Sequence, residues 1–191
     1  MWSYAALAVV SAALVAYAGW RRSGRIAALR RVPAATLATA QPGVRVRITG
    51  AVTRVGDLAA APFSGRPCIA VVGERWELSP RGDPMRCLER QARAATFTID
   101  DGSAVARVIA DPVRCELTTQ PTKIATSGAS RPFGAGVLAA NMERLGNHQI
   151  REGLVTDGAR VTVVATLRRT DAGELELVGS AAEPVTITDA L

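Results

Sequence analysis

Residues 94–110, with the sequence AATFTIDDGSAVARVIA, decide the fold class of this chain. Two runs rich in apolar residues, 94–99 and 104–110, flank the turn sequence Asp-Asp-Gly-Ser at 100–103. An Asp-Gly pair between two such runs is the strongest short signal for a β-hairpin. We therefore expect a strand, a tight turn and a return strand here.

Strand signals continue on both sides of this hairpin. Apolar side chains alternate with Arg and Thr over 44–49, which is the period of a half-buried strand. Further strands are expected at 67–78, 160–166 and 174–178, with a last edge strand at 184–188. We read 79–84 and 149–158 as turns, 113–136 as a loop insertion whose ends pair weakly, and 137–145 as a short helix.

About seven short strands and little helix predict a mainly β fold, most simply a small antiparallel barrel or sandwich. An OB-like closure would suit a five-strand core, but the sequence does not fix the strand order. The hydrophobic residues make up 48% of the chain and the aromatic ones only 4%, so the core is expected to consist mostly of Val, Ala, Leu and Ile.

The first twenty residues predict one N-terminal transmembrane helix. No charged side chain occurs from Trp2 to Trp20, a length that as a helix covers most of a ~30 Å hydrocarbon core. Trp2, Tyr4, Tyr17 and Trp20 lie near its two ends, where aromatic rings favour the headgroup layer. A cleaved signal peptide is disfavoured because the positive charge follows the apolar run instead of preceding it.

Arginines set the expected orientation and the first domain boundary. Arg21, Arg22 and Arg25 follow the apolar run, and Arg30 and Arg31 come soon after. Since such flanks stay cytoplasmic, we expect a single-pass protein of the cell membrane with its N-terminus outside and its globular part in the cytoplasm. Residues 21–42 then form a basic juxtamembrane linker, either a short interfacial helix on anionic lipids or a solvated segment. Residues 43–191 form one β domain that carries the insertion.

Charge and cysteine usage narrow the function classes. The net charge of +6 invites a nucleic-acid partner, but much of it belongs to the membrane flank, and no basic run is interleaved with aromatics. We therefore expect no nucleic acid. Cys68, Cys87, Cys115 and His148 lack the close spacing of a zinc site, and three cysteines do not complete a disulfide framework. Buried thiols are the expectation; if the domain is extracytoplasmic, Cys87 with Cys115 becomes the pair to test.

No residue set predicts catalysis, a cofactor or a metal. Cys68 would need a base within reach, and nothing in the sequence places His148 beside it. Asp100 and Asp101 are adjacent on a strand end and point to opposite faces, so they belong to a turn and not to an acid/base pair. Trp76 is expected to pack in the core or at its rim. The protein is therefore not expected to be an enzyme.

Three sequence blocks in order resemble the GIDE domain, the membrane-adjacent domain of mitochondrial MAPL-type E3 ubiquitin ligases that also occurs in bacterial proteins. The blocks lie at 50–68, 97–105 and 151–161, with a closing segment at 184–189. The residues that carry the match are Gly50, Pro62, Gly65, Pro67, Cys68, Phe97, Asp100, Gly102, Glu152 and Gly158.

The resemblance implies a RING-less bacterial member of that family. The ligases have a second membrane helix and a RING finger after this domain, and neither follows here, so we do not expect ligase activity. Most of the matching residues are expected to be structural. Glu152 is expected to tie the two halves of the barrel by hydrogen bonds, with a binding role as the alternative. The leading interpretation is a membrane-anchored interaction or scaffold module; the alternatives are a component of an E3 ubiquitin ligase-like modification system acting with a partner, and an OB-like ligand-binding domain. The protein partner and the oligomeric state stay unknown.

Overall fold

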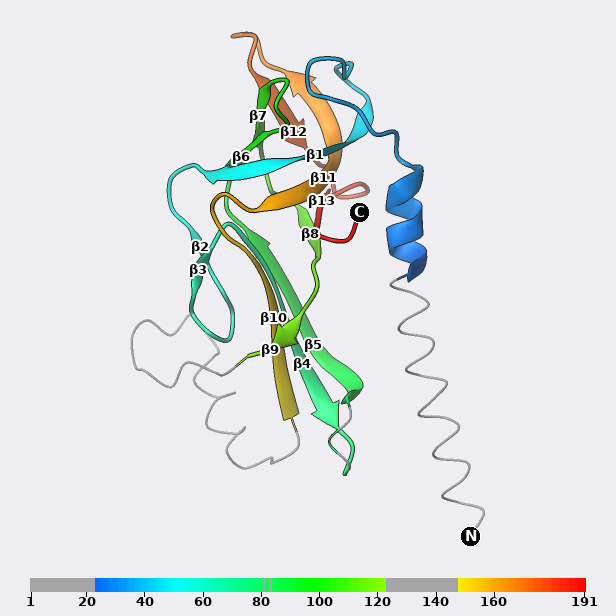
Figure 1. The fold of residues 1–191 in the computed structure, drawn as a ribbon, viewed down its shortest axis with the longest axis vertical. Helices are drawn as coiled ribbons and strands as arrows, with labels where there is room; N and C mark the ends of the chain where they lie inside the picture. The colour runs from blue at the N-terminus through cyan, green and yellow to red at the C-terminus, as the bar shows by residue number, and fades with distance from the viewer. Residues whose placement is uncertain (1–22, 81, 83, 123–147) are drawn as a thin grey trace.

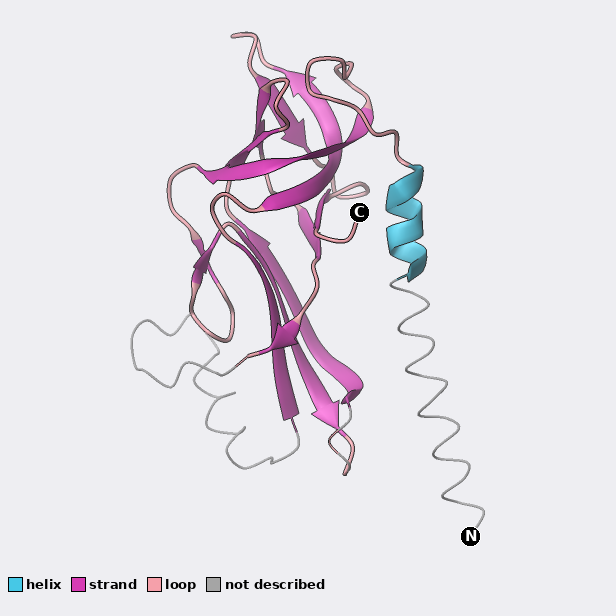
Figure 2. Cartoon of the chain, viewed as in Figure 1, coloured by secondary structure: helices cyan, strands magenta, loops and turns pink. Residues whose placement is uncertain are grey.

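The computed structural model describes residues 23–80, 82, 84–122 and 148–191, and it shows a mainly β chain, as expected. Two main sheets lie one after the other along the long axis of the molecule (Figure 2). In these described parts no helix has both the length and the apolar character needed to cross a membrane. The transmembrane helix predicted for 1–20 and the short helix predicted for 137–145 lie outside the described residues.

The first sheet contains a closed five-strand barrel, so the structure selects the barrel from the two architectures that the sequence predicted. Its strands are β1 (Arg45–Arg54), β6 (Phe97–Asp100), β7 (Val105–Val108), β11 (Arg160–Arg169) and β12 (Leu175–Val178). They are ordered β1-β6-β7-β12-β11, and β1 pairs with β11 to close the ring. Within this ring β7 and β12 run parallel, whereas the other neighbours are antiparallel. The Asp-Gly turn joins β6 to β7 as expected.

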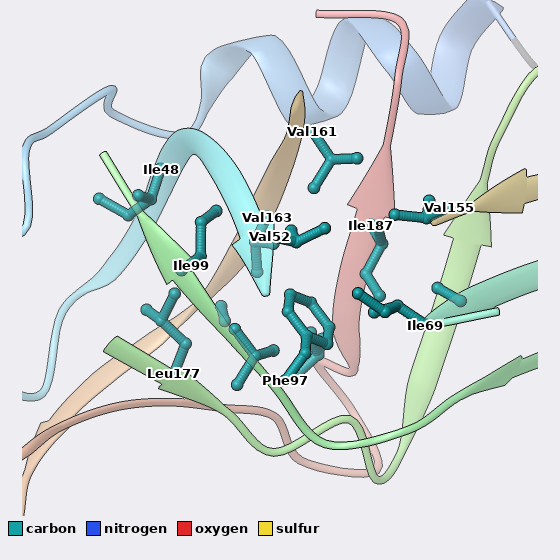
Figure 3. Close-up of a cluster of buried hydrophobic side chains, with 14 of the residues drawn as sticks. Ile48, Val52, Ile69, Phe97, Ile99, Val155, Val161, Val163, Leu177 and Ile187 are labelled. Carbon is teal, nitrogen blue, oxygen red and sulfur yellow. The ribbon is translucent and has the colours of Figure 1, made fainter. Parts of the chain in front are cut away.

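Alternating side chains of the barrel strands fill its interior. Phe97 and Ile99 of β6 are fully buried, and Val163 of β11 and Leu177 of β12 meet them from the other side of the ring (Figure 3). The remaining buried residues of this core are mostly Val, Ile, Leu and Ala, as the composition predicted. Phe97 is therefore a packing residue at the centre of the barrel.

The second sheet has four antiparallel strands and projects from one end of the barrel (Figure 1). Its strands, in spatial order, are β5 (Pro84–Ala94), β4 (Ala70–Leu78), β10 (His148–Val155) and β9 (Gln120–Pro121). The turn predicted for 149–158 was wrong over most of its length, and no strand was expected at 85–93. Both strands contain charged residues that interrupt the apolar pattern, and pairing with β4 overrides their weak local strand signal.

Two further strands extend the first sheet beyond the barrel. β13 (Val185–Thr188) pairs with β11 on one side and with β8 (Val113–Glu116) on the other. The prediction of a last edge strand was therefore wrong, because β13 is paired on both sides and all four of its residues are buried. A small hairpin of β2 (Ala59–Ala60) and β3 (Pro67–Cys68) carries the loop at 61–66.

The residues before β1 pack against the barrel. Residues 23–31 form a helix. The next segment runs along β1, with Ala34 bridged to Arg47, and ends in a turn whose Leu37 is only 1% exposed and belongs to the barrel core. The part of the chain expected as a linker thus contributes both a helix and a core residue.

Candidate functional site

Glu152 holds the loop at 61–66 against the four-stranded sheet. Its side chain is buried in β10, and its Oε1 accepts hydrogen bonds from the backbone amides of Phe63, at 2.9 Å, and Ser64, at 3.2 Å. Its Oε2 and the Ser64 hydroxyl are both buried and have no hydrogen-bond partner among the described residues. We call Glu152 with these two amides the Glu152 clamp.

A glycine opposite the clamp makes room for the loop. Gly73 of β4 pairs with Glu152, and a Cβ at Gly73 would lie 2.5 Å from Pro62 Cγ and 2.8 Å from Phe63 Cε2. The first and third blocks of the GIDE resemblance therefore meet here. Glu152 does form hydrogen bonds across the fold, but it joins a loop to the second sheet instead of joining two halves of the barrel.

A cluster of four charged side chains lies where the two sheets meet, with its two carboxylates buried and its two guanidinium groups partly exposed. Arg90 of β5 places Nη1 3.3 Å from Glu74 Oε1 and donates from Nη2 to Glu116 Oε2 at 3.1 Å. Glu116 Oε1 lies 2.9 Å from Nε of Arg25 in the helix at 23–31. We call Arg25, Glu74, Arg90 and Glu116 the charge cluster; its two positive and two negative charges balance.

Three further hydrogen bonds complete the contacts of the charge cluster. Glu74 Oε2 accepts from Trp76 Nε1 at 3.0 Å and from the Thr119 hydroxyl at 3.1 Å. Arg90 Nη2 also donates to the carbonyl of Cys115 at 2.7 Å. Both carboxylates therefore have cationic or hydrogen-bonding partners within the fold. Trp76 thus has a polar role at the rim of the sheet in addition to packing.

Arg25 differs from its cluster partners because it belongs to the N-terminal helix. Its guanidinium was expected at the membrane interface, and the structure places it against Glu116, whose side chain is 3% exposed. The Nε–H does not point along the line to Oε1, so the contact is an ion pair without an aligned hydrogen bond. The other expected interface residues, Trp2, Tyr4, Tyr17, Trp20, Arg21 and Arg22, lie outside the described residues.

The three cysteines are free thiols. Burial raises the pKa of Cys68 to about 11, with Glu152 adding to the effect, and burial raises the pKa of Cys115 to about 12. Burial also raises the pKa of Cys87, which is only half-buried. His148 pairs with Glu77 at one end of the β4–β10 ladder, and Cys68 lies just before Ala70 at the other end. The two ends are seven residues apart along the strand, which is about 23 Å. Burial of Cys68 and Cys115 was predicted correctly, and these thiols are poor nucleophiles.

The two aspartates of the β6–β7 turn have separate roles, as expected. Asp100 is exposed and accepts from the Gly102 amide. Asp101 accepts from the amides of Leu37, Ser103 and Ala104 and from the Ser103 hydroxyl. Burial acts to raise the pKa of Asp101, but these hydrogen bonds prevail and lower it below its usual value.

The remaining residues of the GIDE resemblance support the backbone. Gly50 lies where β1 crosses β6, and a Cβ there would lie 2.3 Å from the Asp100 carbonyl oxygen. Gly158 has a positive φ of 78° and donates to the Val52 carbonyl in β1. Three others occupy the strand or turns already described: Gly65, Pro67 and Gly102. In the described residues no group of His, Cys, Asp or Glu is arranged to hold a metal ion.

Sequence reasoning missed Glu74, Arg90 and Glu116. A signal was present for Glu74, because it directly follows the apolar residues 69–73 of a strand, where a carboxylate that becomes buried needs a partner. Nothing local identified Arg90 or Glu116 as that partner.

Comparison with family models, with curated proteins and with solved structures finds no match to this chain.

Proposed function

We propose that this protein is a membrane-anchored, non-catalytic interaction module that resembles the GIDE domain. The observation that carries the proposal is that the buried carboxylates and thiols of the described residues have structural contacts. The buried carboxylates of Glu74, Glu116 and Glu152 hold strands, a loop and a helix in place, and the buried thiols have raised pKa values. The GIDE part of the proposal rests on the sequence resemblance, two blocks of which meet at the Glu152 clamp.

The partner surface in this proposal is the β5 edge of the four-stranded sheet, which pairs with no further strand among the described residues. β5 is the edge strand beside β4, and its register is regular from Arg90 to Ala94. Its side chains alternate between exposed and half-buried, with Leu88 37% exposed. An extended peptide adding to this edge would gain main-chain hydrogen bonds, and exposed Arg86 and Arg93 favour acidic side chains in that peptide.

The second candidate is an OB-type ligand-binding barrel, which the strand order and the parallel β7–β12 pair favour. OB barrels bind strands of nucleic acid on a face that supplies stacking aromatics. The exposed residues of β1, β6 and β7 include Ala51, Thr53, Asp100, Val105 and Arg107, and none of the residues in these three strands that face outward is aromatic. A steeply salt-dependent affinity for single-stranded DNA would favour this candidate over the first.

Membrane anchoring and orientation are tested first. The full chain is expected in the membrane fraction after alkaline carbonate extraction. An exposed thiol introduced by Asp171→Cys, in a Cys87→Ser background, is expected to react with a membrane-impermeant maleimide only after permeabilisation. Extraction into the soluble fraction would contradict the anchor, and labelling in intact cells would reverse the orientation.

Partner binding at β5 is tested by site-specific photocrosslinking in intact cells. A benzoylphenylalanine at Leu88, an exposed position at the β-bulge of β5 next to the regular stretch, is expected to give a discrete protein adduct. The matched control is the same residue at Val105, an exposed apolar position on the barrel. Equal adducts from both positions, or none from Leu88, would exclude strand addition at β5.

A further inference from the structure

The β5 edge of the four-stranded sheet offers one regular stretch for pairing. The ladder with β4 keeps a single register from Glu89 to Ala94, and both of its irregularities lie nearer the start of β5. Among the described residues no further strand pairs with β5 on its other side. The sequence of this stretch therefore decides which strand fits the edge.

Backbone hydrogen bonds decide which residues of the stretch can pair with a new strand. The Ala95 amide donates to the Ile69 carbonyl at 2.8 Å, in the same register as the β4–β5 ladder. Since hydrogen-bonded and non-hydrogen-bonded pairs alternate along an antiparallel ladder, Arg93 and Gln91 bond to β4. The backbone amides and carbonyls that point to the open edge are those of Arg90, Ala92 and Ala94.

Three side chains form a polar row along one face of the same stretch. Arg93 donates to Gln91 Oε1 at 3.1 Å, and Gln91 Nε2 donates to Glu89 Oε1 at 2.5 Å. The row thus has a positive end at Arg93 and a negative end at Glu89. An identical row that runs in the opposite direction would bring acid against base at both ends. A row in the same direction would set like charges opposite each other, which is destabilising.

One antiparallel register satisfies the charges and the backbone together. With Gln91 opposite Gln91 of a second copy, each Glu89 faces an Arg93 and the outward-pointing backbone groups meet each other. Centring the pair one residue earlier sets Arg90 opposite Arg90, and centring it one residue later leaves Glu89 opposite Ala95, beyond the strand. A centre between two residues would set outward-pointing groups against groups that already bond to β4.

We propose that β5 pairs with β5 of a second copy of this chain, antiparallel about Gln91, so that two four-stranded sheets form one continuous sheet. This inference rests on the proposed function, since it names the partner of the same β5 edge. The acidic side chain that Arg93 favours in a partner is then Glu89 of the second copy. Each barrel lies at one end of its own sheet, so antiparallel pairing places the two barrels at opposite ends of the joined sheet (Figure 1).

Disulfide crosslinking of the full chain in a mild detergent tests the register. The background is Cys87→Ser, because buried Cys68 and Cys115 react slowly. Gln91→Cys in this background is expected to form a disulfide-linked dimer under mild oxidation. Opposed residues in a non-hydrogen-bonded pair have Cα atoms about 4.5 Å apart, which lies within the range that a disulfide spans.

Arg93→Cys in the same background is the matched control, because position 93 is exposed and lies on the same face. Alone it is expected to give little dimer, since it faces position 89 of the second copy. Co-expression of Arg93→Cys with Glu89→Cys, each with its own tag, is expected to give the mixed dimer. Adding Arg93→Glu to Gln91→Cys is expected to reduce the dimer several-fold, whereas Arg86→Glu, at an exposed position outside the register, is expected to leave it unchanged.

Two outcomes would overturn the inference: no dimer from Gln91→Cys, or equal amounts of dimer from Gln91→Cys and Arg93→Cys. The photocrosslink at Leu88 then separates this failure from a failure of the proposed function. An adduct with a different protein would leave the β5 edge as the partner surface and exclude the second copy as its occupant. If Leu88 gives no adduct either, the β5 edge is not a partner surface and both proposals are wrong.

Discussion

The Asp101 carboxylate accepts a hydrogen bond from the backbone amide of Leu37, 64 positions earlier in the chain, with a distance of 2.6 Å from N to Oδ2. The same carboxylate holds its own turn through Oδ1, which accepts from the amides of Ser103 and Ala104. A residue read from the sequence as part of a hairpin turn therefore also fixes the buried Leu37 at the end of the barrel.

Asp101→Ala is expected to destabilise the fold by about 1.5–3 kcal/mol, because hydrogen bonds to a charged acceptor are lost and the Leu37 amide is left without a partner. The measurement is thermal or urea unfolding of the full chain in a mild detergent, followed by circular dichroism. Asp100→Ala removes a single exposed contact in the same turn and is the control. Similar losses for the two variants would show that the link to Leu37 contributes little.

The stability of the fold is expected to depend on pH through Asp101. Its pKa is lowered by folding, so the stabilisation is complete above the usual carboxyl pKa of 3.8 and is lost as the pH falls through the lower, folded value. The difference in unfolding free energy between the wild type and Asp101→Asn should shrink over that acidic range. A difference that stays constant down to about pH 2 would contradict the lowered pKa.

Glu152→Ala is expected to loosen the loop at 61–66 and to cost about 1–3 kcal/mol. Hydrogen exchange should speed up at the amides of Phe63 and Ser64, which donate to Glu152. Glu152→Gln should retain most of the protection, since its amide oxygen can accept both bonds. The control is Glu174→Ala, which changes an exposed glutamate at the β11–β12 turn. If exchange at these two amides is unchanged in Glu152→Ala, the Glu152 clamp does not hold the loop.

Alkylation of the folded protein is expected to modify Cys87 first. With pKa values of about 11 and about 12, Cys68 and Cys115 are thiolates in on the order of one molecule in a thousand or fewer at about pH 8, and both are buried. Mass spectrometry after iodoacetamide treatment should show one fast modification in the native state and three after denaturation. Rapid modification of Cys68 in the folded protein would show a reactive thiol and would make Cys68 a candidate nucleophile again.

Gly50→Ala is expected to destabilise the barrel by about 1–3 kcal/mol, because the new methyl group would lie against the Asp100 carbonyl in the neighbouring strand. Gly24→Ala, in the N-terminal helix, has open space around the new methyl group and should be neutral or slightly stabilising. Equal melting temperatures of Gly50→Ala and the wild type would show that β1 shifts at no cost.

Most strands of the barrel were predictable because their signals are local, whereas the closure of β1 on β11 was not. The Asp-Gly turn of β6–β7, the alternation of β1 and the hairpin at Asp171-Ala-Gly173 each specify a strand pair from neighbouring residues. β5 and β10 were missed because their strand character comes from β4, which lies between them. A single sequence contains no local trace of that pairing.

The same limit applies to the site. Glu152 was singled out because it matched a family pattern, but its partners Phe63 and Ser64 lie 89 and 88 positions away. The charge cluster was missed because its members come from four separate segments, and burial alone makes their pairing necessary. Polar contacts between residues this far apart in the sequence can be identified only when the fold is known.

The closure of the barrel has a consequence for how the chain folds. β1 pairs with β11, and each of the paired residues is more than a hundred positions from its partner. During synthesis β1 leaves the ribosome long before β11 exists, so it must wait with an unpaired edge until most of the chain has been made. Such a high contact order predicts slow folding and a long interval in which a chaperone is needed to prevent aggregation.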